Sequence, residues 1–267
     1  MSVVLCGDDR LWAFDGWWRP LSCVLPHPTL LCRMNHTLFV LDNRSHLLWG
    51  GGNAVPIMRG VETMLPWEGD LLLLSGETNC LTRLHPETGQ LVMTAHVGDN
   101  PQDACLMPGG MVAVCGGGDG LVRLLRGDTL QTVRTFALPG LPERIAYAGG
   151  ALHVLCAVGD AVVRCRYFRL FGAGEPYALA LLPGLPGAVC ADGRGGVWVA
   201  SSETLVHYAA KADQVDRAIQ GTGLVRHMVC GSGQLLVCDP VMGSCTLFGV
   251  SGIPTASWHG EVGQGVL

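Results

Sequence analysis

Charged residues are scarce in this chain, and clusters of positive charge are missing. Asp, Glu, Lys and Arg make up 15% of the 267 residues, and Lys211 is the only lysine. The remaining basic residues are arginines spread along the sequence, and the formal net charge is −5. Nucleic acids and anionic membrane surfaces are recognised by clustered positive charge. From this composition we therefore expect no nucleic-acid partner.

Long apolar segments are also missing, although 49% of the residues are hydrophobic. The longest uninterrupted stretches, such as Leu71–Leu74, are far shorter than the about 20 residues of a membrane-spanning helix. Short apolar packets separated by Gly, Pro and Asp are typical of buried strands. Met1–Asp9 has no basic leader followed by an apolar stretch, so we expect no secretory signal and a cytoplasmic location. These features predict an all-β chain with no membrane span.

The twelve cysteines lack the close pairing of a metal site, because no two of them lie within six residues of each other. They recur instead inside apolar packets, as at Cys115, Cys156 and Cys238. A free thiol in such a place behaves as a small buried hydrophobe. We expect reduced core thiols, which fits a reducing compartment.

What the sequence does contain is an internal repeat. Three segments, Pro101–Val114, Pro142–Val154 and Pro186–Val199, each combine a proline, a short apolar strand, a Gly-rich turn and a second apolar strand. Weaker copies run over Pro28–Leu41, Val61–Leu74 and Arg226–Cys238. The turns recur at intervals of about 39 residues, which is the period of a four-stranded propeller blade. A sandwich or a pair of smaller barrels is the alternative, but neither explains this period.

The same period accounts for the two chain ends. One step back from the first turn falls just before Met1, so the first blade lacks its innermost strand. Its other strands are expected at Val3–Cys6, Leu11–Phe14 and near Leu21–Leu25. The leftover segment Glu261–Leu267 can supply the missing strand and remove an exposed sheet edge. We therefore predict one domain over residues 1–267, a seven-bladed β-propeller whose first blade is closed by the N- and C-terminal strands.

The repeats resemble two known propeller families. Pro101–Gly116 is similar to the YVTN repeat, which has a proline, an apolar strand, a Pro-Asp-Gly-like turn and a Val-Tyr-Val strand. Asp192–Ala200 reads DGRGGVWVA and resembles a segment common in NHL-type and lyase or lactonase propellers. No Trp-Asp signature of WD repeats is present. The resemblance implies the architecture, and it leaves the function open because these folds host binders, scaffolds and enzymes.

Polar residues follow the repeat proline at the start of several predicted inner strands. Inner strands of all blades begin at one mouth of the central tunnel, so these side chains are expected to converge there. One predicted column holds Thr29, Glu62, Gln102, Glu143, Gly187 and His227. The neighbouring column holds Thr63, Asp103 and Arg144. We take Glu62, Gln102, Asp103, Glu143, Arg144 and His227 as candidate ligand-binding residues.

Two interpretations of these columns stay open. The side chains either bind a small polar ligand or a cation, or they only line a hydrated tunnel with local ion pairs. Carboxylate oxygens suit Ca²⁺ or Mg²⁺, and Glu62 with Glu143 would be the metal ligands. A shift of one residue in the alignment would turn a column to the other face of its sheet.

Trp17 and Trp18 form a second candidate. Two large aromatic residues in a turn either plug the space between blades or form an exposed surface for docking a protein. We favour the plug and keep docking as the alternative.

No catalytic motif is present, since neither a Gly-x-Ser-x-Gly elbow nor a phosphate-binding loop before a helix occurs. The sequence favours a non-catalytic binding or scaffold propeller that recognises a protein or a small polar ligand at the tunnel mouth, with no cofactor. The alternative is an enzyme resembling lactonase or lyase propellers. In it a cation held by Glu62, Gln102 and Glu143 stabilises an oxyanion, and His227 transfers a proton.

Overall fold

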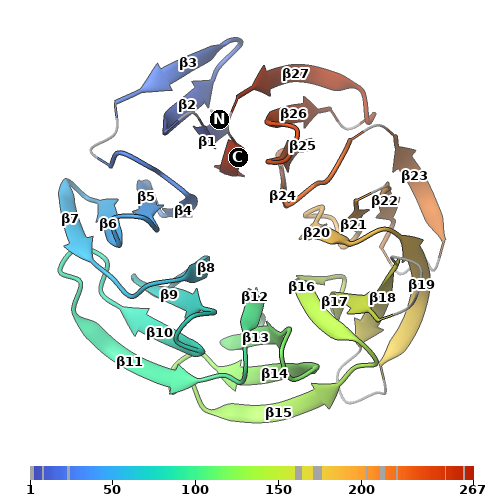
Figure 1. Cartoon of the computed structure of the whole chain (residues 1–267), viewed down its shortest axis with the longest axis horizontal. Helices are drawn as coiled ribbons and strands as arrows, with labels where there is room; N and C mark the ends of the chain where they lie inside the picture. The colour runs from blue at the N-terminus through green and yellow to red at the C-terminus, as the bar shows by residue number, and fades with distance from the viewer. Residues whose placement is uncertain are drawn as a thin grey trace.

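The computed structural model describes residues 3–7, 9–22, 25–159, 164–170, 176–202, 204–210, 214–220, 222–249, 251–260 and 262–267. Within these ranges, 28 strands form seven four-stranded sheets. Figure 1 shows the sheets arranged as blades around a central axis, with the two chain ends side by side in one blade. The predicted seven-bladed β-propeller is confirmed.

The blades are numbered here from the N-terminus, and strands are given from the axis outwards. Blade 1 holds β28 (Val262–Val266), β1 (Val3–Gly7), β2 (Arg10–Phe14) and β3 (Trp18–Leu21). Blade 2 holds β4 (Leu30–Met34), β5 (Thr37–Asp42), β6 (Leu47–Gly50) and β7 (Asn53–Pro56). Blade 3 holds β8 (Val61–Trp67), β9 (Asp70–Ser75), β10 (Cys80–Leu84) and β11 (Leu91–His96). Blade 4 holds β12 (Pro101–Met107), β13 (Met111–Gly116), β14 (Leu121–Arg126) and β15 (Thr132–Ala137).

The remaining three blades follow the same order. Blade 5 holds β16 (Leu141–Ala148), β17 (Ala151–Val158), β18 (Arg164–Leu170) and β19 (Tyr177–Pro183). Blade 6 holds β20 (Pro186–Ala191), β21 (Val197–Ser201), β22 (Leu205–Tyr208) and β23 (Val215–Ile219). Blade 7 holds β24 (His227–Gly231), β25 (Gln234–Asp239), β26 (Ser244–Phe248) and β27 (Pro254–His259).

Blade 1 is closed by both chain ends, as the period predicts. β28 pairs antiparallel with β1, placing Val266 opposite Val4 and Gly265 opposite Leu5. The Gln264 side chain also accepts a hydrogen bond from the backbone amide of Leu31 in blade 2 at 2.9 Å. One expectation is corrected here: the outer strand β3 begins at Trp18 rather than near Leu21, because the turn before it is tighter than we assumed.

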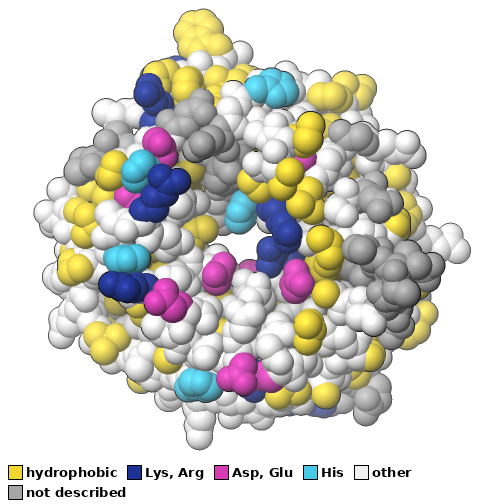
Figure 2. Space-filling model, viewed as in Figure 1, with side chains coloured by type: hydrophobic (Ala, Val, Ile, Leu, Met, Phe, Trp, Pro, Cys, Tyr) yellow, Lys and Arg dark blue, Asp and Glu magenta, His cyan; other side chains and the backbone are white. Residues whose placement is uncertain are grey.

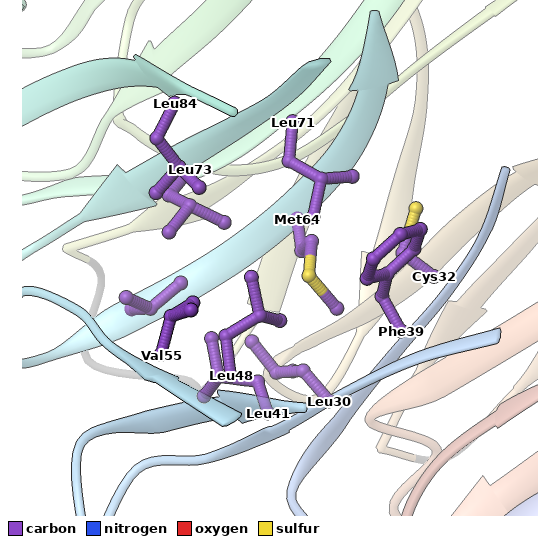
Figure 3. Close-up of a cluster of buried hydrophobic side chains, with 11 residues drawn as sticks. Leu30, Cys32, Phe39, Leu41, Leu48, Val55, Met64, Leu71, Leu73 and Leu84 are labelled. Carbon is purple, nitrogen blue, oxygen red and sulfur yellow. The ribbon is translucent and has the colours of Figure 1, made fainter. Parts of the chain in front are cut away.

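The hydrophobic core is divided among the spaces between neighbouring blades. Seven clusters of buried side chains each combine residues from two adjacent blades. Figure 3 shows the cluster between blades 2 and 3, where Leu41 and Phe39 of β5 face Met64 and Leu71 of the next blade. The second strand of each blade has neighbours on both faces, so it is mostly apolar, and β9 is buried along its whole length.

Tight turns and short polar side chains connect these strands. Ser232 (φ 51°) and Gly233 (φ 75°) form the two-residue turn between β24 and β25, and positive φ at both positions suits a β-hairpin. Asp42 ends β5 with its side chain fully buried, and its carboxylate accepts bonds from the backbone amides of Arg44, Ser45 and His27. The Asp42 side chain thereby ties a hairpin to the segment that enters the same blade.

The described cysteines agree with the expected core thiols. Ten of them are free, and seven of these are buried, including Cys115, Cys156 and Cys238. Cys23 and the side chain of Cys165 lie outside the described residues. No helix in the described part of the chain is long and apolar enough to cross a membrane.

Candidate functional site: the tunnel mouth

A β-bulge repeats at the start of the inner strand in four successive blades. The register shifts between Val61 and Thr63, between Pro101 and Asp103, between Pro142 and Arg144, and between Pro186 and Ala188. The extra residues at these shifts are Glu62, Gln102, Glu143 and Gly187, which are four of the six residues in the first column predicted from the sequence. Bulges re-aim side chains and are frequent next to functional sites. In this chain the bulges lie at the tunnel mouth, and the strand pairing is regular further along each inner strand.

The next residues along these strands meet around the axis. They line a cavity of about 270 Å³ together with residues of blades 1 and 7. Its polar lining consists of Glu62, Thr63, Gln102, Asp103, Arg144, Arg226, His227 and Gln264. Figure 2 shows acidic, basic and histidine side chains around the central opening. Five of the six candidate residues from the sequence therefore share one cavity.

Glu143 is the candidate that is not among the described residues lining this cavity. Its backbone carbonyl instead accepts a hydrogen bond from the Arg144 guanidinium at 2.7 Å. The predicted pairing of Glu62 with Glu143 as metal ligands thus joins one residue of the cavity lining with one outside it. Among the described residues, no group of three or more His, Cys, Asp and Glu side chains is arranged to hold a metal ion.

Asp103 connects three blades. Its carboxylate accepts hydrogen bonds from the Thr63 hydroxyl of blade 3 at 3.0 Å and from the Ile145 amide of blade 5 at 3.0 Å. The Ala104 amide of its own strand donates a third bond at 2.8 Å. Burial raises the pKa of Asp103 above its ordinary value, and the Arg144 charge and these bonds oppose that rise. Asp103 therefore holds neighbouring inner strands together at the base of the mouth.

Two guanidinium groups bring positive charge to the cavity. Arg144 donates from Nε to the Gly187 carbonyl at 3.0 Å, and Arg226 donates from Nη1 to the Pro186 carbonyl at 3.3 Å. Within the described residues neither arginine lies at ion-pair distance from a carboxylate. A guanidinium carries five N–H donors, so both retain capacity for a further acceptor. Both side chains are fixed by carbonyl groups of blade 6, and the Arg144 charge also acts on the carboxyl groups of Asp103 and Glu62.

Gly187 makes the close approach of blades 6 and 7 possible. A Cβ atom at this position would lie 2.5 Å from the Val225 carbonyl oxygen and 2.8 Å from that of Ala200. Both are backbone atoms that cannot move aside without shifting a strand. Glycine is therefore required sterically where the Arg144 and Arg226 side chains anchor.

His227 lies beside both arginines. Burial, together with the positive charges of Arg144 and Arg226, lowers its pKa from 6.5 to about 4. The imidazole is therefore neutral near pH 7, and no described residue is hydrogen-bonded to its ring. Glu62 lies on the other side of the cavity. Desolvation raises the pKa of Glu62, the charge of Arg144 lowers it, and the charge of Asp103 raises it, with a net increase.

The pairing registers correct the predicted columns at blade 7. His227 pairs with Cys238 of the neighbouring strand, just as Asp103 pairs with Cys115 in blade 4. His227 therefore belongs to the second column, and Arg226 occupies the position of Glu62 and Gln102. The sequence alignment missed Arg226 because it began this copy at Arg226 and so placed that residue at the position of the repeat proline, which Val225 occupies. Gln264 was also missed, although the period alone assigned its segment to the inner ring.

The two tryptophans have different environments. Trp18 packs against Phe14 at a ring distance of 5.1 Å, and its indole N–H donates to the Ser257 carbonyl of blade 7 at 3.1 Å. Trp18 thus fills the space between blades 1 and 7, in the manner of the predicted plug. Trp17 is 72% exposed, so the prediction that it plugs the space between blades is wrong for this residue. Whether Trp17 docks a protein stays a prediction.

A second polar cluster lies between blades 6 and 7, away from the mouth. His207 is buried, with Nδ1 2.6 Å from Asp216 and Nε2 3.1 Å from Asp192. Its ring also packs on Trp198 at a centroid distance of 4.7 Å. Both ring nitrogens of His207 contact carboxylates of the protein, so neither is left to contact a ligand. We therefore assign this cluster to the stability of the fold.

Comparison with known proteins shows the fold and no family. No protein-family model matches the chain, and no curated protein matches its sequence. Many solved structures share its architecture. A protein from Lactobacillus plantarum aligns with a TM-score of 0.77 at 12% identity, covering 99% of each chain.

Other structural neighbours are functionally diverse. Catalytically inactive virginiamycin B lyase from Staphylococcus aureus, solved with quinupristin, gives a TM-score of 0.70 at 10% identity over 89% of this chain and 92% of the lyase. The WD40 β-propeller domain of Doa1 gives 0.68 at 14% identity over 88% and 85%. A fold shared by enzymes and WD40 domains does not decide between catalysis and binding. What these comparisons establish is that the chain is a seven-bladed β-propeller.

Proposed function

We propose that this protein is a non-catalytic binding propeller whose tunnel mouth recognises a ligand through an anionic group. The observation that carries the proposal is the pair of guanidinium groups, Arg144 and Arg226, which line one cavity and donate only to carbonyls among the described residues. Charge-assisted hydrogen bonds from arginine to carboxylate are among the stronger polar contacts in proteins. Glu62 and Gln102 lie on the other side of the cavity. The Glu62 carboxylate can accept hydrogen bonds from other polar groups of the ligand, and the Gln102 amide can donate or accept them.

The charge distribution favours an anion over a cation at this position. A metal ion at His227 would lie close to the two guanidinium charges that already depress the pKa of its imidazole. Among the described residues of the cavity lining the only carboxylates are Glu62 and Asp103, and Asp103 is occupied by three protein donors. An anion meets two positive groups and a neutral imidazole instead.

The protonation state of His227 also favours binding over proton transfer. General acid–base catalysis is most effective when the pKa of the catalytic group is near the working pH. A pKa of about 4 makes His227 a weak base at neutral pH. The metal-assisted lyase or lactonase alternative needs both a cation and an efficient proton carrier here. It predicts that Ca²⁺ or Mg²⁺ raises the melting temperature and that EDTA lowers it, whereas the binding proposal predicts no change.

Acetate is the simplest probe of the anion site. Saturation-transfer or line-broadening NMR with ¹³C-acetate at neutral pH and constant ionic strength should detect binding with a Kd on the order of 1 mM. Arg226→Gln should weaken this binding by at least about tenfold, because one charged hydrogen bond contributes about 1.5–3 kcal/mol. Arg126→Gln is the matched control, since Arg126 is exposed at the opposite end of blade 4 and pairs with Asp128. Equal binding by wild type and Arg226→Gln, or no binding at all, would overturn the proposal.

A further inference from the structure

The residues at the rim of the tunnel mouth differ in polarity from one side to the other. At the entry to the inner strands of blades 5, 6 and 7 the residues are Leu141, Leu185 and Leu224. Each follows a glycine with positive φ, and each precedes a buried residue, Pro142, Pro186 or Val225. At the corresponding entries of blades 2, 3 and 4 the residues are His27, Gly60 and Asn100. One side of the rim is therefore aliphatic, and the other is polar.

The three leucines present apolar surface to solvent. Leu141 is 48% exposed and Leu185 45% exposed, while Leu224 is half-buried. Met242 extends the surface in blade 7, because it is 72% exposed and its Cγ lies 3.4 Å from the Cβ position of Gly223. The inner strands β16, β20 and β24 contact one another in sequence, so these residues follow each other around the rim. We call Leu141, Leu185, Leu224 and Met242 the leucine arc.

The leucine arc adjoins the arginine pair. Arg226 is two residues beyond Leu224, and Arg144 is three residues beyond Leu141. In Figure 2 hydrophobic side chains gather to the right of the opening, where Figure 1 places β16, β20 and β24, and basic and acidic side chains lie between them and the opening. The polar side includes His27, which contacts Asp9 at 2.6 Å and Arg44 at 3.3 Å. Apolar surface and available positive charge therefore coincide on one side of the mouth.

We propose that the ligand of this mouth is a small amphiphilic carboxylic acid. Its carboxylate lies between Arg144 and Arg226, and its hydrocarbon part lies over the leucine arc. This inference rests on the proposed function and specifies the chemical class of the ligand. We place the carboxylate by its charge complementarity with the two arginines. We place the hydrocarbon tail by the exposed apolar side chains that lie beside the charged cavity. A cavity of about 270 Å³ suits a small molecule at the lower end of ordinary ligand sites.

A homologous series of acids tests the inference. We would measure the Kd of acetate, butyrate, hexanoate and octanoate at one ionic strength and below micelle-forming concentrations. Full burial of a methylene strengthens binding by about fourfold. A tail in contact on one side only should gain about twofold per methylene, or roughly sixtyfold over the six methylenes from acetate to octanoate. In Leu185→Ser this gain should shrink while acetate binding stays unchanged.

Two variants serve as controls. Leu91→Ser removes a leucine that is 59% exposed on the outer strand β11, and it should leave the whole series unchanged. Arg226→Gln should weaken every acid by the same factor, because it acts on the shared carboxylate. A gain with chain length that stays at its wild-type size in Leu185→Ser would mean that the tails bind elsewhere, which overturns the inference.

The outcomes separate the inference from the proposed function. If acetate binds and depends on Arg226, but octanoate binds no tighter, the anion site stands and the leucine arc has no part in ligand binding. If an N-acetylated peptide acid ending in leucine gains affinity where octanoate does not, the arc recognises a polypeptide terminus and the small-acid inference is wrong. If no acid binds, both the proposed function and the inference fail.

Discussion

Single ionisable side chains carry the electrostatics of the tunnel mouth, and His227 reports on them most directly. Its pKa is lowered to about 4 first by burial and then by the charges of Arg144 and Arg226. Removing one positive charge in Arg226→Gln should therefore move the pKa of His227 part of the way back towards 6.5. An NMR titration of the imidazole resonance measures this shift. An unchanged pKa would mean that Arg226 does not face the cavity as described.

A second histidine links pH to the stability of the fold. His153 is 3% exposed, and its ring nitrogens contact the Tyr167 hydroxyl at 2.5 Å and the Ala148 carbonyl at 3.1 Å. Burial lowers its pKa from 6.5 to about 4, so the unfolded chain takes up a proton in a range where the folded chain does not. The stabilisation is complete above pH 6.5 and is lost as the pH falls towards 4.

This loss should amount to at most roughly 3 kcal/mol of unfolding free energy. Urea unfolding at pH 7, 5.5 and 4.5 would measure it. In His153→Gln the dependence on pH should become shallower, although the variant is less stable at pH 7. His36→Gln, at an exposed turn, is the control and should keep the wild-type slope. A wild-type slope in His153→Gln would show that another group is responsible.

The inner strands are the elements that position the site, and Gly187 tests their packing. In Gly187→Ala the new methyl group would meet two backbone carbonyls at 2.5 and 2.8 Å. Such overpacking costs about 1–3 kcal/mol. Gly159→Ala is the control, since nothing lies within 4 Å of a Cβ at that position. Chemical denaturation of both variants measures the difference. Equal stability of the two variants would contradict the close packing of β20 against β24.

The closing strand β28 should be essential to the ring. Truncation after residue 261 removes the partner of β1 and the Gln264 bond to Leu31. It also leaves unpaired strand edges, which promote association between molecules. We expect a melting temperature at least about 10 °C lower and a tendency to aggregate, in calorimetry and light scattering. A monomer with wild-type melting would show that blade 1 is complete without β28.

At the scale of the whole molecule, the sequence predicts the ring well because its period is a property of turns. Gly and Asn at the hairpins and mostly apolar second strands recur even where the strands themselves diverge. The leftover segment at the C-terminus then follows from counting, and the pairing of Val4 with Val266 confirms it.

Side-chain positions at the mouth were predicted less completely, for a physical reason. A bulge shifts the register by one residue, and the sequence marks it by a preceding proline in blades 4, 5 and 6 but not in blade 3. Where Val225 replaces that proline, the alignment placed His227 in the wrong column and passed over Arg226. The separate environments of Trp17 and Trp18 depend on the exact start of β3, which turn length decides and composition does not.

The central claim is that an anionic group binds between Arg144 and Arg226 at the tunnel mouth. Crystals soaked in 4-bromobenzoate would test it most directly, because the carboxylate is seen in the electron density and the bromine in the anomalous map. We predict the carboxylate within hydrogen-bonding distance of both guanidinium groups and the bromine over the leucine arc. A ligand bound at full occupancy elsewhere, with only water between the two arginines, would contradict the account.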